Sequence, residues 1–156
     1  MKRTHTCGQL TKANVGENVT LTGWVNSCRD LGGLIFINLR DRQGLTQIFL
    51  DPDAGADLME IGGQIRDEWV LTIHGVVRSR PADMINASMT TGAVEVMAQT
   101  IEVENKSRPM PFHLDDDKVS EELRLKYRYL DFRRSNIAEF MKIRHRLGKV
   151  FRDYFD

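Results

Sequence analysis

The sequence predicts a mainly β fold, in which a small five-stranded barrel is followed by a linker and C-terminal helices. Five segments alternate apolar and polar residues with the two-residue period of strands that bury one face. A short helical pattern separates the third of these segments from the fourth. Beyond about residue 105 the composition changes, first to a stretch with two prolines and three consecutive aspartates, and then to a helical period.

The first three strands are expected in the N-terminal third of the chain. The first covers about residues 18–28 and is followed by a turn at Gly32-Gly33. The next two form a hairpin over residues 34–50. Alternation gives this hairpin two faces. Ile35, Ile37, Leu39, Thr46, Ile48 and Leu50 share the face that looks like core, and Leu34, Phe36, Asn38, Leu45, Gln47 and Phe49 share the opposite one.

The remaining elements of the barrel follow the hairpin. Residues 55–66 carry the helical pattern, which Gly62 and Gly63 weaken. A fourth strand is expected over residues 69–78 and a fifth over 93–104, with a polar, mobile loop between them. This is the element order of the OB-fold, in which three strands, a helix and two strands follow one another within about a hundred residues. This closed barrel often binds oligonucleotides on the face of its second and third strands.

The C-terminal part of the chain is expected to be helical. The chain divides into a barrel over residues 1–105, a linker over 106–119 and a helical segment over 120–156. Two helices are expected in this last segment, the first capped by Ser120 and the second by Ser135. The apolar residues that share one side of the second helix are Ile137, Phe140, Met141, Leu147, Val150, Phe151 and Tyr154.

The charge balance restricts how the chain can bind nucleic acid. Of its 156 residues, 22 are basic and 22 are acidic, so the whole chain does not attract polyanions. A nucleic-acid site must therefore be local. The arginines expected near strand ends are one candidate for such a site, and an ordinary solvated surface is the alternative. These arginines are Arg29, Arg40, Arg42, Arg78 and Arg80.

Several other classes of site find no support in the sequence. It contains no Walker phosphate loop, no Rossmann glycine fingerprint and no evident nucleophile–base pair. Cys7 and Cys28 form neither a C-x-x-C pair nor a metal-ligand cluster. His74 is expected to be structural, and the aspartates at 115–117 to face solvent. The sequence therefore predicts no catalytic, metal or cofactor site in this chain. Without a signal peptide or a membrane-length apolar run, a cytoplasmic location is expected.

The outer face of the hairpin offers a candidate base-binding surface. Phe36 and Gln47 lie on this face, on adjacent expected strands. A flat ring beside an amide suits stacking on one unpaired base and hydrogen bonding to its edge. The alternative is an ordinary two-sided hairpin in which Phe36 and Phe49 pack under a loop. The residues of the hairpin alone favour this alternative.

Longer motifs indicate a family. Gly23-Trp24-Val25-Asn26, the stretch from Arg29 to Arg42, Gly44 and Gln47 resemble the anticodon-binding domain of bacterial-type aspartyl-tRNA synthetases. The stretch from Arg124 to Arg134 resembles the segment that enters the catalytic domain of class IIb synthetases, and lysyl-tRNA synthetases share it. The resemblance covers nearly the whole chain in the right order. One departure is that Ser27 and Cys28 interrupt a run of arginines that the family usually has.

The resemblance implies roles for particular residues. The barrel would bind the anticodon stem-loop of the aspartate tRNA, with Phe36 stacked on the middle base and Gln47 hydrogen-bonded to it. Glu95 would contact the third base, where a carboxylate can accept from the amine of cytosine. Arginines would form the rim, and Asn86 keeps the family's residue in an otherwise irregular loop. The anticodon-binding residues would be Phe36, Gln47, Glu95, Arg29, Arg78, Arg80 and Asn86.

The resemblance also implies a longer parent protein. Neither arginine motif of class II catalytic domains is present, so this chain is expected to be inactive alone. The parent would join aspartate to tRNA through aspartyl-adenylate, with ATP and magnesium, as a homodimer formed through its catalytic domain. The alternatives are a free-standing OB-fold module for tRNA or single-stranded nucleic acid, the anticodon domain of a lysyl-tRNA synthetase, and a structural domain that binds nothing.

Overall fold

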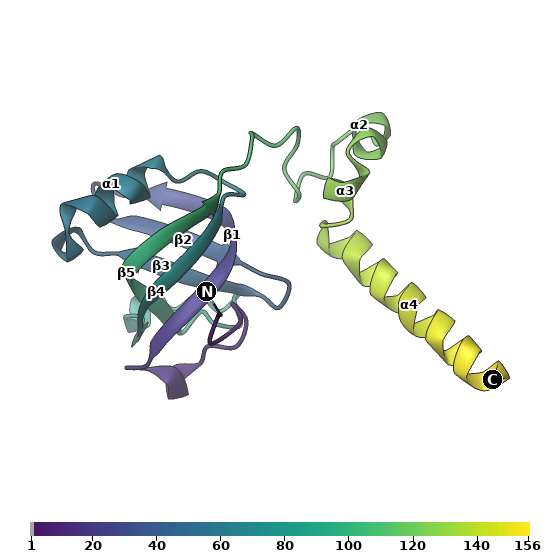
Figure 1. Ribbon diagram of the computed structural model, residues 1–156, viewed down its shortest axis with the longest axis horizontal. Helices are drawn as coiled ribbons and strands as arrows, with labels where there is room; N and C mark the ends of the chain where they lie inside the picture. The colour runs from purple at the N-terminus through teal and green to yellow at the C-terminus, as the bar shows by residue number, and fades with distance from the viewer. Residues whose placement is uncertain (1) are drawn as a thin grey trace. The chain divides into compact units, whose positions relative to one another are not determined.

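A computed structural model describes residues 2–156, except for the side chain of Ser135 (Figure 1). It confirms the predicted fold class, because the five strands form a closed barrel in the order β1-β2-β3-β5-β4, with α1 between β3 and β4. The strands are β1 (Asn18–Asp30), β2 (Ile35–Arg40), β3 (Leu45–Leu50), β4 (Val70–Ser79) and β5 (Val94–Asn105). The helices are α1 (Ala56–Gln64), α2 (Glu121–Lys126), α3 (Arg128–Asp131) and α4 (Ser135–Phe155), with short 3-10 turns at Lys12–Asn14, Pro52–Ala54 and Ala82–Met84.

The two faces of the β2–β3 hairpin follow the sequence alternation. All six residues expected on the core side are buried. The one polar residue among them, Thr46, donates a hydrogen bond from its hydroxyl to the carbonyl of Cys7 at 2.6 Å, which offsets the cost of burying it. On the opposite side, Phe36, Asn38, Leu45 and Gln47 are partly exposed. Phe49 differs from its neighbours on that side, since only 7% of its surface is exposed.

A β-bulge divides β1 into two halves that face differently. Val25 pairs with Leu39 and Ser27 with Asn38, so Asn26 is an extra residue. Before the bulge, odd-numbered residues such as Val19 and Val25 are buried. After it, the alternation is reversed, because Arg29 pairs with Phe36 on the outer face. The bulge therefore brings Arg29 to the same surface as the exposed side of the hairpin.

Two glycines let neighbouring strands of the barrel approach each other closely. A Cβ atom added to Gly23 would collide with the carbonyl of Arg40, and one added to Gly75 with the carbonyl of Met97. The parallel pairing of β3 with β5, at Ile48–Val96 and Phe49–Met97, completes the closure. A side chain at either glycine would force neighbouring backbones apart.

The chain divides into two compact units, residues 1–109 and 110–156. The second has its own small core of Phe112, Leu114 and Leu130. It contains three helices, whereas the sequence predicted two, because the backbone leaves the helical region at Tyr127 (φ −111°, ψ 48°) and separates α2 from α3. Ser120 caps α2 as expected, accepting a hydrogen bond from the backbone N–H of Leu123 at 3.4 Å.

The longest helix carries an exposed apolar stripe. α4 begins at Ser135 with Arg134 as its N-cap residue, and the expected capping by the Ser135 side chain lies outside the described residues. Phe140, Leu147 and Tyr154 on this helix are 65%, 56% and 81% exposed. No helix among residues 2–156 is both long enough and apolar enough to cross a membrane.

A buried carboxylate organises the second unit. The side chain of Asp131 is fully buried and accepts hydrogen bonds from Arg124 at 2.8 Å and Arg128 at 3.0 Å. Arg134 lies 3.9 Å from the same carboxylate. The hydrogen bond from Arg124 lowers the pKa of Asp131 below its usual 3.8, burial opposes this change, and the charges of the three arginines add to it. The ion pairs tie α2, through Arg124, to α3 and to Arg134 at the N-cap of α4.

We predict that acid disrupts the second unit. Because the pKa of Asp131 is lowered in the folded state, its stabilisation is present above the unfolded value of about 4 and is lost as pH falls below it. All three tyrosines lie in the second unit and both tryptophans in the barrel, so near-ultraviolet circular dichroism can report on the two units separately. Asp131→Asn should weaken the tyrosine signal at neutral pH and abolish its acid transition, whereas Asp115→Asn should retain it. An acid transition that survives in Asp131→Asn would contradict this role.

Candidate nucleic-acid interface

The candidate surface lies on the outer face of β2 and β3, which we call the hairpin face, with Phe36 at its centre. Phe36 pairs with Phe49 across the ladder, and the two ring centroids are 5.2 Å apart with the planes tilted by 41°. Phe36 stays partly exposed, whereas Phe49 is covered by the guanidinium of Arg78, whose central carbon is 4.0 Å from the ring centroid. Phe49 thus packs under a cation from β4, and it supports Phe36 from the side.

Gln47 and Glu95 are joined directly to each other. The Gln47 Nε2 atom donates to Glu95 Oε2 at 2.8 Å, which joins β3 to β5 on this face. Since that amide donates to Glu95, the carbonyl oxygen of Gln47 is the part of the side chain that can accept a further hydrogen bond. The geometry therefore turns Gln47 into an acceptor for an N–H group on a ligand.

Glu95 is buried and balanced by arginines. Its side chain is only 4% exposed, and its Oε1 atom accepts from Arg78 Nε at 2.8 Å. Arg80 Nε lies 4.0 Å from the other oxygen and donates to the carbonyl of Val94 at 3.1 Å. Each carboxylate oxygen has a second lone pair, so Glu95 can accept from a ligand without releasing Gln47 or Arg78.

The two neighbouring arginines occupy different depths. Arg78 is 39% exposed and lies at the surface, whereas the Arg80 side chain is 4% exposed and lies beneath it. Burial lowers the pKa of Arg80 from its usual value, and the charge of Glu95 opposes this change. The Arg80 Nη2 atom is buried without a hydrogen-bond partner among the described residues. Arg80 therefore supports the buried Glu95 and does not belong to the exposed rim of arginines that the family resemblance implied.

The other expected site residues lie beside the face. Arg29 is exposed and pairs with Phe36 across the β1–β2 ladder. Asn86 is exposed in the loop over residues 81–92, where its Oδ1 atom accepts from the backbone and hydroxyl of Ser88. At the end of that loop, the hydroxyl of Thr91 donates to the carbonyl of Leu45. The side-chain hydrogen bonds of Asn86 stay within the loop.

The remaining candidate arginines differ in their availability. Arg40 donates to both carboxylate oxygens of Glu68, at 2.7 and 2.9 Å, and to Asn26 at 2.7 Å. These contacts commit Arg40 to the barrel wall. Arg42, in the turn of the hairpin, is exposed. Two features of this face had no signal in the sequence: the stacking of Arg78 on Phe49, and a hydrogen bond at 3.0 Å from Asn38 to Ser27.

The polar groups away from the hairpin face have structural contacts. His74 Nδ1 lies 2.8 Å from the Thr20 hydroxyl, and Asp117 pairs with Arg134 at 2.8 Å. Cys7 and Cys28 are free thiols, and burial, with a smaller contribution from Asp41, raises the pKa of Cys7 to about 12. Over residues 2–156, no three His, Cys, Asp or Glu side chains come together as a metal site.

Comparison with known proteins shows which family the chain belongs to. Residues 19–104 match the family described as OB-fold nucleic acid binding domain. The aspartate–tRNA(Asp/Asn) ligase of Opitutus terrae is 50% identical over 159 residues, which cover 100% of this chain and 27% of the ligase. The aspartate–tRNA ligase of Listeria monocytogenes is 47% identical, covering 99% of this chain and 26% of the ligase. The chain thus spans about a quarter of the length of these relatives.

A solved structure supports the same fold. The aspartyl tRNA synthetase from Entamoeba histolytica superposes with a TM-score of 0.85 at 20% identity, over 99% of this chain and 37% of that one. Together with the ligases above, it confirms the resemblance that the hairpin motif indicated.

The ion-pair cluster of Glu95, Arg78 and Arg80 predicts how much stability the barrel loses when Glu95 is removed. Glu95→Ala leaves Arg80 buried without its nearest negative charge, so we expect the barrel to lose about 3 kcal/mol of unfolding free energy. Urea unfolding followed by tryptophan fluorescence measures this loss. Glu102→Ala, on an exposed position of the same strand, should change stability by no more than about 0.5 kcal/mol. Equal effects of the two substitutions would show that the cluster does not stabilise the barrel.

Proposed function

The chain belongs to the family of OB-fold nucleic acid binding domains, and we propose that it recognises the anticodon stem-loop of the aspartate tRNA. The observation that carries this proposal is the hairpin face, where a partly exposed ring lies beside an amide held by a buried carboxylate. The identity of 47–50% to aspartate–tRNA ligases over essentially the whole chain supports the choice of RNA.

Phe36 would provide the stacking surface for the middle base of the anticodon. One face of an aromatic ring accepts any base, so stacking supplies affinity with little sequence preference. Phe49 and Arg78 hold the ring in place from one side. Because the ring is already ordered, little conformational entropy is lost when the base binds.

Gln47 and Glu95 would supply the sequence preference. The carbonyl oxygen of Gln47 would accept from a ring N–H on the Watson–Crick edge of the middle base, as uracil and guanine offer. The remaining lone pairs of Glu95 would accept from the exocyclic amine of a cytosine in the third position. The hydrogen bond between the two side chains places both acceptors side by side.

The exposed arginines would hold the phosphates. Arg29 lies beside Phe36 across the ladder, and Arg78 covers the neighbouring ring of Phe49. Phosphate contacts fix the position of an RNA strand without reading its sequence. Arg80, beneath the surface, would act by positioning Glu95, and Asn86 would border the face from the neighbouring loop.

The rest of the activity would belong to a longer protein. The ligase that contains this chain would form aspartyl-adenylate from ATP with magnesium and transfer aspartate to the tRNA in the cytoplasm. It would be a homodimer formed through the catalytic domain, in which the apolar stripe of α4 is covered. This chain alone would bind RNA without catalysing the reaction.

Removal of the stacking ring is the main test. Phe36→Ala should weaken binding of the aspartate anticodon stem-loop by roughly 1–3 kcal/mol, because one base loses its platform. Fluorescence anisotropy with labelled RNA measures the affinity, and circular dichroism checks the fold. Val15→Ala, which removes an exposed apolar side chain elsewhere in the first unit, should bind the RNA with the same affinity as the unsubstituted chain. Unchanged affinity of a folded Phe36→Ala variant would refute the proposal.

A second prediction separates base recognition from phosphate contact. Gln47→Ala should reduce discrimination between the cognate loop and one altered at the middle base. Arg29→Ala should weaken all loops alike and reduce the slope of log affinity against log salt by about 0.7–0.9. Titrations of both loops at two salt concentrations distinguish these effects. A uniform loss with Gln47→Ala, or an unchanged slope with Arg29→Ala, would contradict the assigned roles.

A further inference from the structure

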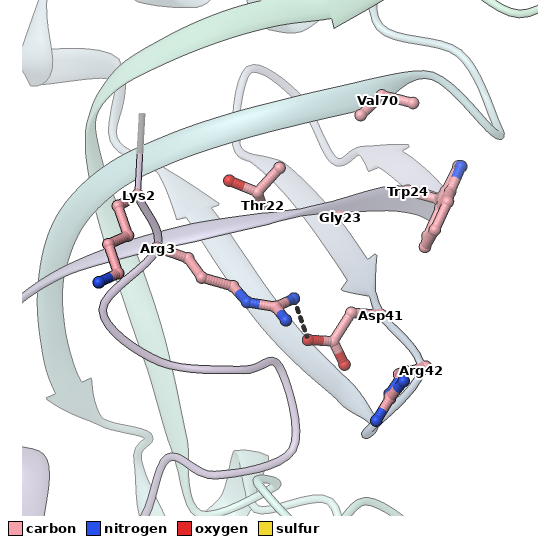
Figure 2. Close-up of a pocket in the computed structure, with 8 residues that line it drawn as sticks. All are labelled: Lys2, Arg3, Thr22, Gly23, Trp24, Asp41, Arg42 and Val70. Atoms are coloured by element: carbon pink, nitrogen blue, oxygen red, sulfur yellow. Dashed lines mark ion pairs between the residues drawn. The ribbon is translucent and has the colours of Figure 1, made fainter.

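A second concave site lies between the N-terminal segment and β1. Figure 2 shows Arg3 at its centre, with Lys2 on one side and Trp24 and Arg42 on the other. The pocket has a volume of about 460 Å³, within the usual range for small-molecule and cofactor sites. Val70 of β4 forms another part of its wall. We call this the N-terminal pocket.

The charge of this pocket is positive. Lys2, Arg3 and Arg42 contribute three cations against the single carboxylate of Asp41. That carboxylate is 3% exposed and already accepts hydrogen bonds from backbone N–H groups, namely Cys7 at 2.9 Å, Gln43 at 2.7 Å and Gly44 at 3.1 Å. Arg3 lies 3.7 Å from it, so Asp41 fixes the position of Arg3. Lys2 and Arg42 are exposed and in no ion pair among the described residues, so they can bind an anion.

The wall of the pocket is aromatic and apolar. Trp24 is half-buried in β1, and the adjacent Gly23 has no side chain to fill the space. Cations beside an indole ring match the two parts of a nucleotide, because the base can stack on the ring while the phosphate is held by lysine and arginine. An acidic peptide would use the cations but leave the indole without a matching planar group.

The N-terminal pocket lies at one end of β2, the strand that carries Phe36, because Asp41 and Arg42 in its lining directly follow this strand. Trp24 pairs with Arg40, and Arg40 lies on the same side of β2 as Phe36, four residues along the strand. At about 3.3 Å per residue, the Arg40 end of this surface lies about 13 Å from Phe36. A nucleic-acid strand that advances about 3.4 Å per nucleotide covers this distance in about four nucleotides. Trp24 precedes the bulge and Arg29 follows it, and both nevertheless face outward.

We propose that the N-terminal pocket binds one nucleotide of the RNA strand leaving the hairpin face, with Trp24 stacked on the base and Lys2 and Arg42 holding the phosphate. The inference rests on the proposed function, since it assigns a second contact to the same RNA. It identifies Trp24 and Arg42 as RNA-binding residues outside the anticodon triplet.

Tryptophan fluorescence tests the stacking. The chain has two tryptophans, so Trp69→Phe leaves Trp24 as the sole indole. Titration of this variant with the aspartate anticodon stem-loop should quench its emission, whereas Trp24→Phe, which leaves Trp69, should show little change. Trp24→Leu should weaken binding at least about fivefold, and Trp24→Phe should retain most of the affinity, because a ring remains for stacking.

The phosphate contact has its own variant, which does not touch the barrel core. Arg42→Ala should lower the slope of log affinity against log salt by about 0.7–0.9. The matched control is Lys12→Ala, since Lys12 is an exposed cation outside the pocket and should leave the slope unchanged. Arg42→Ala and its control Lys12→Ala therefore test whether the pocket binds RNA even if Trp24→Leu fails to fold.

The outcomes separate this inference from the proposed function. If Phe36→Ala weakens binding while Trp24 emission and the Arg42→Ala slope do not change, the pocket is not an RNA site and the anticodon proposal stands. If Phe36→Ala has no effect either, both fail. If a polyglutamate peptide quenches Trp24 at the same concentrations as the RNA, the pocket is a site for acidic segments and the inference is overturned.

Discussion

The hairpin face depends on how one buried carboxylate is balanced. Glu95 is nearly inaccessible to water, and it would be costly to bury without Arg78, Arg80 and Gln47 around it. Gln47 lies on β3, Glu95 on β5 and Arg78 on β4, with Arg80 just after β4. Their contacts therefore fix the order of side chains across these three strands. Arg78 extends the network to Phe49, and through that ring to Phe36. Ion pairs and hydrogen bonds therefore hold the side chains of this face in place as much as apolar packing does.

A buried carboxylate balanced by arginines also organises the second unit. There, Asp131 is surrounded by three arginines, and its ion pairs hold together helices too short to be stable alone. Both units thus use a buried acid to organise arginines. In the barrel the acid lies under a partly exposed surface with acceptor sites to spare, whereas in the second unit the arginines hold it in the interior.

The sequence predicted the strands of the barrel and the faces of the hairpin, because alternation is a local property. It predicted Phe36 and Gln47 on one surface for the same reason. The burial of Arg80 depends on the register between β4 and β5, which has two irregularities, and a single sequence does not reveal it. The break at Tyr127 was missed because helical periodicity continues through it.

The bulge at Asn26 is the point of β1 at which the strand can lose one residue without changing which side chains face outward. Asn26 lies between Val25 and Ser27, which pair with the consecutive residues Leu39 and Asn38 of β2, so Asn26 itself has no partner on β2. Without Asn26 the ladder would be regular, and Ser27, Cys28 and Arg29 would keep their partners on β2, so Arg29 would still lie opposite Phe36 on the outer face. A deletion in the regular part of β1 would instead move the residues on one side of it to the opposite face of the sheet. The strand can therefore lose a residue at the bulge more readily than anywhere else along its length.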